Sequence, residues 1–550
     1  MKKFFARFRP IDICFVILLA AVVRYGLVVK DRIYGDGLEY IVQTQSIALF
    51  GRLSIDRGRI SDYWNKTNPY GLTLSVVPPR SLELAERSQA RGNFGGLYPD
   101  GSGRYHYYHP WIYSLLVSPL YRIFHIIQPG GPLEYQSFRV MNTLFLCLPF
   151  LLAWCAGGSW PLLLIMILTL FSPLIPYTDW THAELFCFCF IYLGFWAVKS
   201  PVLRFFGPAF LGLAAAQVAP AAWFFLPHLY YRLTYPDRPV GKERGKIILS
   251  YLLGFLLVSI SSFYFYAYFR QFNLVAAIGL ASFEYASWHR ALCILFSPMI
   301  GALWFFPAAF LFIPSLFKRE SCLFILISLV SCAGAAWMAS ATANLNSGQV
   351  GATRYAVWLI GPLWFAILNR DWVIERLGVN LRSLLFVLAA GLSVTVILYF
   401  QTYWLPLKYI RPFRTSRRAI PETAAIYRWT GFRDDAEILV ENIIKRDYPF
   451  RVRSFRLICV WNLGRDRSLW VIPERALGNL EYFVWEEKAL PRYRVYPANE
   501  DVFQESEEGI VLIPERVKRY IPHPVVGNYV LVRMKREVSG VESNVPVYIR

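Results

Sequence analysis

The chain has 550 residues, of which 56% are apolar and 17% aromatic, and its mean hydropathy of +0.37 argues against a soluble protein. A formal net charge of +20 would indicate nucleic-acid binding in a soluble chain. Here many of the basic residues lie in short loops between apolar runs, where the positive-inside rule places them, so nucleic acid is excluded as a partner.

The first apolar run, 13–29, is predicted to be a retained signal-anchor helix. It contains Arg24, and no small-residue cleavage site follows before Lys30. The nine cysteines form no CxxC pair, and eight of them lie in apolar runs, with Cys459 in the polar tail. This distribution predicts neither a disulfide framework nor a zinc site.

Ten apolar segments predict about eleven transmembrane helices, because each is close to the roughly 20 residues that span a bilayer and one is long enough for two crossings. Pro220 divides that longer segment, 205–231, into two short helices. Segment 111–127 is instead predicted as an interfacial amphipathic helix, because it contains Pro119, Arg122 and His125. The ten segments are 13–29, 140–156, 161–176, 183–198, 205–231, 247–269, 292–317, 322–341, 356–368 and 384–400.

Loop charges predict the topology. The basic N-terminus and the basic loops all fall on one side, which is therefore the cytoplasmic side. The outer side then carries the loops 30–109, 177–182, 270–290 and 342–354. The tail after residue 400 is also predicted to lie outside.

The tail, 401–550, differs in composition and sequence pattern from the membrane domain, 1–400. It is charged and contains short strand-like runs, together with one helix-like segment at 422–430. A small extracytoplasmic α/β domain is predicted. The strand-like runs are 437–440, 457–460, 469–472, 509–513 and 529–532.

The loop 30–109, about 80 residues long, is the longest predicted connection and a candidate active site. It opens with Gly35-Asp-Gly-Leu-Glu-Tyr40, at the start of a segment that looks amphipathic. Asp36 and Glu39 are three residues apart and can share a helix face. A carboxylate here is either a general base or part of a capping box, with Asp36 as N-cap and Glu39 at the third helical position.

The same loop closes with an aromatic run that follows Arg104 and includes His109. Such aromatic density is typical either of a membrane-interface belt or of a platform for a sugar. Pro110 holds the backbone of His109 extended.

The segment 177–184 brings Asp179, His182 and Glu184 together before a strongly apolar helix. Polar groups at membrane depth are costly, which favours a functional role. The alternative is capping of the next helix by Asp179 or Thr181, with His182 and Glu184 in its first turn.

The last predicted outer loop ends with Arg354 and Tyr355 at the start of a helix. A helix start beside an arginine is a plausible phosphate site. The alternative is a flexible loop whose arginine side chain reaches the membrane surface.

The order of these motifs resembles the GT-C superfamily of glycosyltransferases that use polyprenyl-phosphate sugars. The nearest branches resemble bacterial relatives of protein O-mannosyltransferases and lipid A aminoarabinose transferases. The resemblance covers roughly residues 10 to 400. It rests on Gly35-Asp-Gly-Leu-Glu-Tyr40, Leu49-Phe-Gly-Arg-Leu53, His109-Pro-Trp-Ile-Tyr-Ser-Leu-Leu-Val-Ser-Pro119, the 179–184 cluster, Leu295-Phe-Ser-Pro-Met-Ile-Gly-Ala-Leu-Trp-Phe-Phe-Pro307 and Gly351-Ala-Thr-Arg-Tyr355.

The resemblance implies a multi-pass protein of a bacterial cytoplasmic membrane, surrounded by membrane lipids. It implies a polyprenyl-phosphate-sugar donor, an extracytoplasmic acceptor (a glycan, a lipid or a protein), and inversion at the anomeric carbon. Asp36 is then the base, and Arg354 holds the donor phosphate together with Arg104 and His109. The aminoarabinose transferases carry a basic residue where this chain has His109.

The other catalytic candidates by this resemblance are Glu39, Asp179, His182 and Glu184, and the tyrosines expected to bind substrate are Tyr40 and Tyr355. Some relatives bind a divalent metal through paired acidic loops, for which Asp36 with Asp179 or Glu184 are the candidates.

Two other functions are compatible with the hydrophobic helices. A transporter or flippase of lipid-linked glycans explains the helices and the basic charge, but not a long polar loop after the first helix. A membrane scaffold with an outer binding domain explains the tail. Convergence of the loop residues on one cavity favours the enzyme.

Overall fold

The computed structural model describes residues 10–29, 37–55, 97–155, 174–234, 242–277, 281–283, 285–297, 300–302, 319–342, 345, 354–359 and 361–368, and within the tail 455–463, 466–473, 503–506, 509–512, 532–538 and 541–549. The chain divides into two units. The first consists of Met1–Ala281, Phe305–Met338 and Tyr355–Ile397, and the second of Ser282–Trp304, Ala339–Arg354 and Leu398–Arg550.

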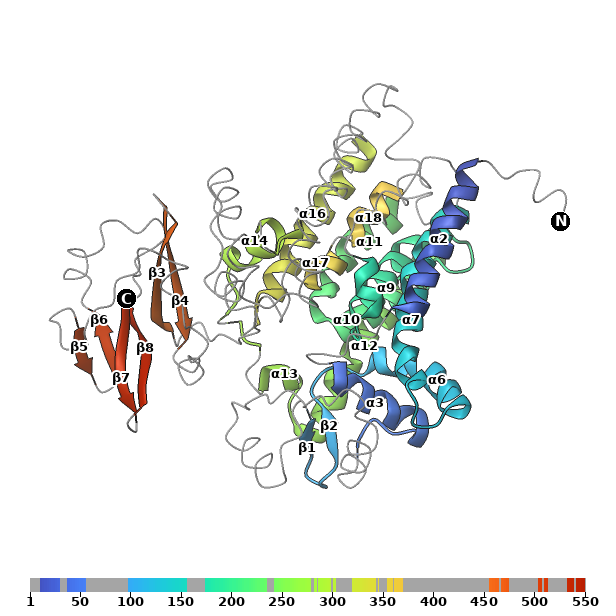
Figure 1. Cartoon of the computed structure of the whole chain (residues 1–550). Coiled ribbons are helices and arrows are strands. Elements are labelled where there is room, and N and C mark those ends of the chain that lie inside the picture. Colours follow the sequence, from blue (N-terminus) through green and yellow to red (C-terminus); the bar gives the residue numbers. More distant parts are fainter. Residues whose placement is uncertain are drawn as a thin grey trace. The chain divides into compact units, whose positions relative to one another are not determined.

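In the first unit, helix α2 (Pro10–Val28) packs against α7 (Leu133–Cys155) (Figure 1). Arg139 of α7 donates hydrogen bonds to the carbonyls of Val29 and of Leu27, the latter at 3.0 Å. The last carbonyls of a helix have no partner within the helix, so this arginine stabilises the end of α2.

Helix α3 (Gly37–Phe50) packs against α6 (Ile112–Ile127), next to a short hairpin of β1 (Leu97–Pro99) and β2 (Tyr105–Tyr107). The amphipathic prediction for α3 is wrong, because its apolar Ile41 and Val42 are buried as completely as its polar Glu39 and Gln43. In a membrane protein the polar side chains turn toward the protein interior.

Helix α6 matches the helix predicted over 111–127. Its buried face includes Tyr113, Val117 and Tyr121, and its exposed face is also apolar, with Ile126 72% exposed. Apolar residues thus line both faces, and the interfacial location of α6 stays a prediction.

The long apolar segment 205–231 is broken as predicted. It forms α10 (Gly207–Gln217), a 3-10 turn η2 (Ala219–Phe224) and α11 (Phe225–Thr234). Pro220 lies in the first turn of η2, where a missing backbone N–H costs nothing. The short helix α9 (Glu184–Ala197) packs against α7 and α10.

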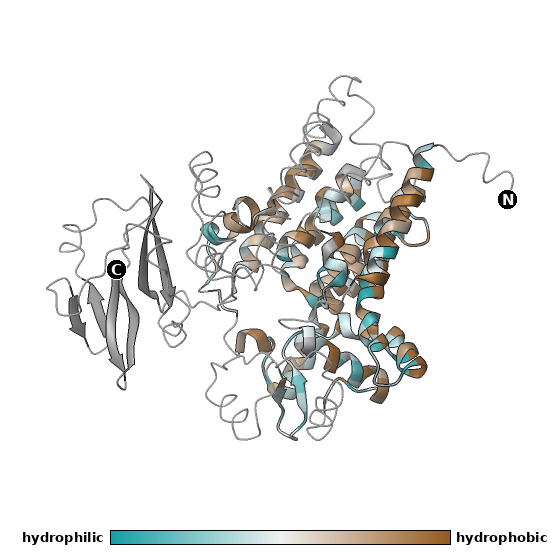
Figure 2. Cartoon of the chain, in the orientation of Figure 1, coloured by the Kyte–Doolittle hydropathy of each residue, from teal (hydrophilic) through white to brown (hydrophobic). Residues whose placement is uncertain are grey.

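Within the part of the chain that the structure describes, three helices are long and apolar enough to cross a membrane, namely Leu133–Cys155 in α7, Glu243–Phe269 in α12 (Lys242–Phe269) and Cys322–Ala339 in α16 (Arg319–Ala339). Figure 2 shows brown, apolar residues along the helices of this unit. These helices make the chain a membrane protein. The predicted total of eleven stays untested, since much of 156–173, 303–318 and 369–400 lies outside the described residues.

Three short helices complete the first unit. They are α13 (Leu274–Ala277), α17 (Arg354–Leu359), whose first residue belongs to the second unit, and α18 (Gly361–Leu368), which packs against α9.

The second unit contains α14 (Trp288–Phe296) and six strands. Strands β3 and β4 form an antiparallel pair, while β5, β6, β8 and β7 form a sheet in that order, with β6 parallel to β8. The predicted runs 457–460, 469–472 and most of 509–513 lie in β3, β4 and β6. The helix at 422–430 lies outside the described residues, so the α/β domain stays a prediction. The strands are β3 (Phe455–Leu463), β4 (Asp466–Pro473), β5 (Phe503–Ser506), β6 (Gly509–Leu512), β7 (Val532–Val538) and β8 (Val541–Ile549).

Candidate functional site

Tyr40, in the first turn of α3, is the centre of an aromatic cluster. Its side chain is only 2% exposed. Its ring centroid lies 5.2 Å from that of Tyr107, 5.3 Å from that of His182 and 5.4 Å from that of Tyr113. The ring of His109 stacks on it at 6.2 Å. Three segments far apart in the sequence therefore meet at one tyrosine, and three of the predicted site residues are brought together.

Gln217, the last residue of α10, fixes this cluster by hydrogen bonds. Its Nε2 donates to the hydroxyl of Tyr40 at 3.2 Å and to the carbonyl of Pro110 at 3.1 Å. Its Oε1 accepts from the backbone N–H of Tyr113 at 3.0 Å. One amide thus joins α3, α10 and the start of α6.

Asn142 of α7 continues the polar chain toward the segment 180–184. The hydroxyl of Tyr113 donates to Asn142 Oδ1 at 3.0 Å, and Asn142 Nδ2 donates to the carbonyl of Trp180 at 2.7 Å. Sequence reasoning missed both Asn142 and Gln217. The available signal was an amide inside an apolar run, where an unpaired polar group is expensive.

His182 and Glu184 form a buried pair beside Tyr40. His182 Nδ1 lies 3.1 Å from Glu184 Oε1, and both side chains are 5% exposed. The indole of Trp180 lies 4.5 Å from the imidazole ring. A carboxylate next to an imidazole can hold and orient a proton, which is the chemistry expected of an acid–base site.

The predicted capping of α9 is wrong in its details. The N-cap is Ala183, no side chain caps the helix, and Asp179 instead ends the 3-10 turn η1 (Ile175–Asp179). Thr181 lies before the cap, and His182 precedes the helix rather than occupying its first turn, whereas Glu184 does lie there. The cause is the extended Trp180, whose carbonyl is bound by Asn142.

Glu39 is completely buried beneath the hairpin. Burial raises the pKa of the Tyr98 phenol, and the nearby Glu39 carboxylate raises it further. Asp36 lies outside the described residues. Helix α3 is described from Gly37 onward, so the capping role predicted for Asp36 stays a prediction.

Arg104 lies at the end of the turn between β1 and β2, and its side chain is exposed. The turn is held by Asp100, whose Oδ1 accepts from the Ser102 N–H at 2.8 Å and from the Arg104 N–H at 3.0 Å. A carboxylate that accepts from the backbone two residues later is a common turn device.

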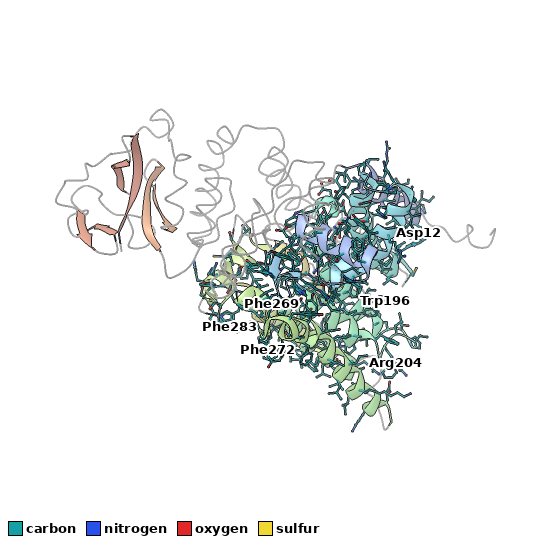
Figure 3. The ribbon with its side chains drawn as sticks, turned by 90° about the horizontal axis from the view of Figure 1, so that it is seen from below. Asp12, Trp196, Arg204, Phe269, Phe272 and Phe283 are labelled. Carbon is teal, nitrogen blue, oxygen red and sulfur yellow. The ribbon has the colours of Figure 1, made fainter. Side chains whose placement is uncertain are left out.

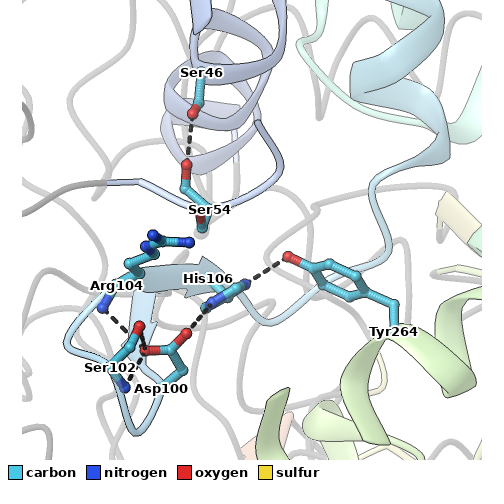
Figure 4. Close-up of polar contacts among 7 residues, drawn as sticks. All are labelled: Ser46, Ser54, Asp100, Ser102, Arg104, His106 and Tyr264. Atoms are coloured by element: carbon cyan, nitrogen blue, oxygen red, sulfur yellow. Dashed lines mark hydrogen bonds and ion pairs between the residues drawn. The ribbon is translucent and has the colours of Figure 1, made fainter. Parts of the chain in front are cut away.

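His106 of β2 fastens the hairpin to α12 and was not anticipated from the sequence. Its Nε2 lies 3.0 Å from Asp100 Oδ2, and its Nδ1 lies 2.5 Å from the hydroxyl of Tyr264 (Figure 4). Burial lowers the pKa of His106, and the hydrogen bond that His106 donates to Asp100 opposes this only in part. Burial would raise the pKa of Asp100, but hydrogen bonds from Ser102, His106 and the Arg104 backbone outweigh burial and lower that pKa.

Arg354 and Tyr355 begin α17, so a helix does start where it was predicted. The ring of Tyr355 lies 6.1 Å from that of Trp358. The approach of Arg354 to the other candidate residues stays a prediction. Among the residues that the structure describes, no three His, Cys, Asp or Glu side chains gather as in a metal site, and the proposed metal pair includes Asp36, which is not described.

No family model matches the chain. No curated protein matches it either. Among solved structures, the crystal structure of ArnT from Cupriavidus metallidurans in the apo state is similar, with a TM-score of 0.40 and 12% sequence identity over 79% of this chain and 71% of that chain.

Proposed function

We propose that this chain is a membrane glycosyltransferase that moves a sugar from a polyprenyl-phosphate carrier to an acceptor outside the cytoplasmic membrane of a bacterium. The observation that supports it most is the convergence at Tyr40. Residues of α3, of the strand and loop 105–113 and of the segment 180–184 gather there, and all three regions adjoin segments predicted to face outside. The order of the sequence motifs supports the same reaction.

The proposed reaction exchanges two bonds at the anomeric carbon. The acceptor hydroxyl oxygen attacks that carbon from the face opposite the phosphate, and the bond to the phosphate oxygen breaks. The carrier leaves as a phosphate monoester and the sugar is inverted. Asp36 takes the proton of the acceptor hydroxyl.

The aromatic cluster has two tasks in this proposal. The half-buried ring of His109, stacked over Tyr40, offers an apolar face to the sugar ring. The pair of His182 and Glu184 orients the acceptor through hydrogen bonds. Arg354 holds the phosphate on which charge builds as the sugar leaves, because its planar guanidinium can pair with two oxygens at once.

The donor sugar is identified first. Mass spectrometry of cell-envelope glycans from cells with and without the protein gives the sugar that disappears, and purified protein is then supplied with that sugar on a polyprenyl phosphate. A glycosyltransferase releases free carrier phosphate and sugar-modified acceptor together. A transporter leaves the bond between carrier and sugar intact, so an absence of free carrier phosphate contradicts the proposal.

The Asp36→Asn variant tests the base. We expect a loss of transfer of at least about 100-fold, the usual contribution of general base catalysis, with donor binding largely retained. Asp31→Asn, the same chemical change in the same loop, is the matched control and should transfer sugar at the wild-type rate. Near-wild-type transfer by Asp36→Asn would end this assignment and make Glu39 or Asp179 the next carboxylate to test.

A further inference from the structure

Three basic side chains surround the ring of Phe205, away from the aromatic cluster at Tyr40. The guanidinium of Arg204 lies 5.1 Å from the ring centroid. The guanidinium of Arg232 and the ammonium of Lys246 each lie 5.8 Å from it. They come from the loop after α9, from α11 and from the first turns of α12. Three separate elements thus concentrate positive charge at one point.

One carboxylate faces these three cations. Glu243 Oε1 lies 2.6 Å from Arg232 Nη2 and 3.1 Å from Arg204 Nη1. The four side chains therefore carry three positive charges and one negative charge, a net charge of +2. The Nε atoms of Arg204 and Arg232 are buried and make no hydrogen bond within the described part of the chain. The site therefore has positive charge that Glu243 does not neutralise and that an anion can pair with.

The basic side chains of this cluster differ in how exposed they are to an approaching anion. Arg232 is 3% exposed and is held by Glu243, whereas Arg204 remains 40% exposed. Figure 3 labels Arg204 beside one end of α12 and Phe269, the last residue of that helix, at the other end. An anion can therefore reach Arg204 and Lys246 without displacing the buried pair.

An apolar stripe begins beside this charge and continues along α12. Its residues recur at intervals of three and four, so they lie on one face of the helix. Each is between 53% and 68% exposed, and the stripe consists of Ile248, Leu249, Leu252, Phe255, Leu256 and Phe263. A ligand that matches both parts has an anionic group at one end and hydrocarbon along the rest.

We propose that Arg204 and Lys246, beside the ion pair of Arg232 and Glu243, bind the phosphate of an anionic phospholipid whose acyl chains lie along the exposed face of α12. A soluble phosphate would use the charge but not the stripe, and a zwitterionic lipid would bring its own cation to a site that is already positive. The site is separate from the proposed transfer of sugar and does not depend on it.

Native mass spectrometry of the full-length protein tests this binding. The protein is released from detergent after incubation with phosphatidylglycerol or with phosphatidylcholine, and retained lipid is counted. We expect at least about tenfold more retained phosphatidylglycerol, and we expect the Arg204→Gln/Lys246→Gln double variant to lower that retention to the phosphatidylcholine level. Excess inorganic phosphate should displace little of the lipid.

The matched control is Arg270→Gln. Arg270 follows the other end of the same helix and lies 5.6 Å from the ring of Tyr266, so it pairs one cation with one aromatic ring. It should retain phosphatidylglycerol like the wild type. Undiminished retention in the double variant, or an equal loss in Arg270→Gln, would overturn the proposal. If the double variant does not fold, Lys246→Gln alone must lower retention, and no loss there would also overturn it.

Discussion

Tyr40 contributes to the protein in two ways that single substitutions can separate. Tyr40→Phe removes the 3.2 Å hydrogen bond from Gln217 but keeps the ring, and should cost about 1 kcal/mol of the free energy of unfolding. Tyr40→Ala also removes the contacts with Tyr107 and His182, and should cost about 3–5 kcal/mol. Thermal unfolding in detergent measures both. Tyr266→Phe, at an exposed tyrosine, is the control, and equal losses in the two Tyr40 variants would contradict the ring contacts.

His106 should make the stability of the hairpin depend on pH. Burial keeps the pKa of His106 below its ordinary value of 6.5, so the folded chain resists the proton that the unfolded chain accepts. Stability is therefore complete above about pH 6.5 and falls as the pH drops below it. The lowered pKa of Asp100 works in the same direction at still lower pH.

The variant His106→Gln tests this dependence, because an amide can still reach Asp100 and Tyr264 but does not titrate. Its unfolding temperature should change less than that of the wild type between pH 7.5 and about pH 5. His289→Gln, at an exposed histidine of α14, should keep the wild-type dependence. The same slope in His106→Gln and in the wild type would show that His106 is not the titrating group.

Single residues were predictable where a polar group stands next to an apolar run. That rule found His182 and Glu184, whereas Tyr40 and His109 were expected from the family resemblance, and the structure places the four together. The rule missed the contacts of Gln217 with Tyr40 and of His106 with Tyr264, since these partners lie more than 100 residues away in sequence.

Helices α10 and α12 approach closely at two glycines. A Cβ atom on Gly212 would lie 2.4 Å from the carbonyl oxygen of Gly254, and a backbone atom cannot move aside as a side chain does. Gly212→Ala should therefore destabilise the protein by about 1–3 kcal/mol. Gly245→Ala, where nothing lies within 4 Å, should instead stabilise it by about 0.5–1 kcal/mol. A thermal shift of the same sign in both variants would contradict this packing.

Elements were predictable where composition and a breaking residue agree. The run 205–231 is too long for one ordinary membrane span and contains Pro220, and the structure breaks it after Gln217. The start of α9 was not predictable in detail, because Asp179 and Thr181 are good capping residues by type. The bond from Asn142 to Trp180, a tertiary contact, decides that boundary.

The topology of the whole chain is a separate prediction from its loop charges. Reporter fusions after Arg550 should be active outside the cytoplasm. Fusions in the loop 235–241 should be active inside, because this loop lies within the basic stretch 232–246 and basic stretches are retained in the cytoplasm. Alkaline phosphatase and a fluorescent protein report the two sides. A cytoplasmic signal at Arg550 would remove an odd number of helices and separate the predicted outer loops.

At the scale of the molecule, the apolar runs were sufficient to predict a helical membrane protein, and three spans support it. The number of crossings and the nature of the tail depend on how segments pair in space, and pairing is not encoded in hydropathy. The strands β6 and β8, for example, are parallel neighbours separated by β7 in the sequence.

The alternation of side chains in β2 limits which insertions and deletions this gene can accumulate. Neighbouring residues of a strand point to opposite sides, so His106 reaches Tyr264 while Tyr107 reaches Tyr40. One residue gained or lost within 105–107 exchanges the two sides and removes both contacts at once. One residue inserted at 101–103 changes only the exposed turn between β1 and β2. Length variation among descendants of this sequence is therefore expected in the turn and not in the strand.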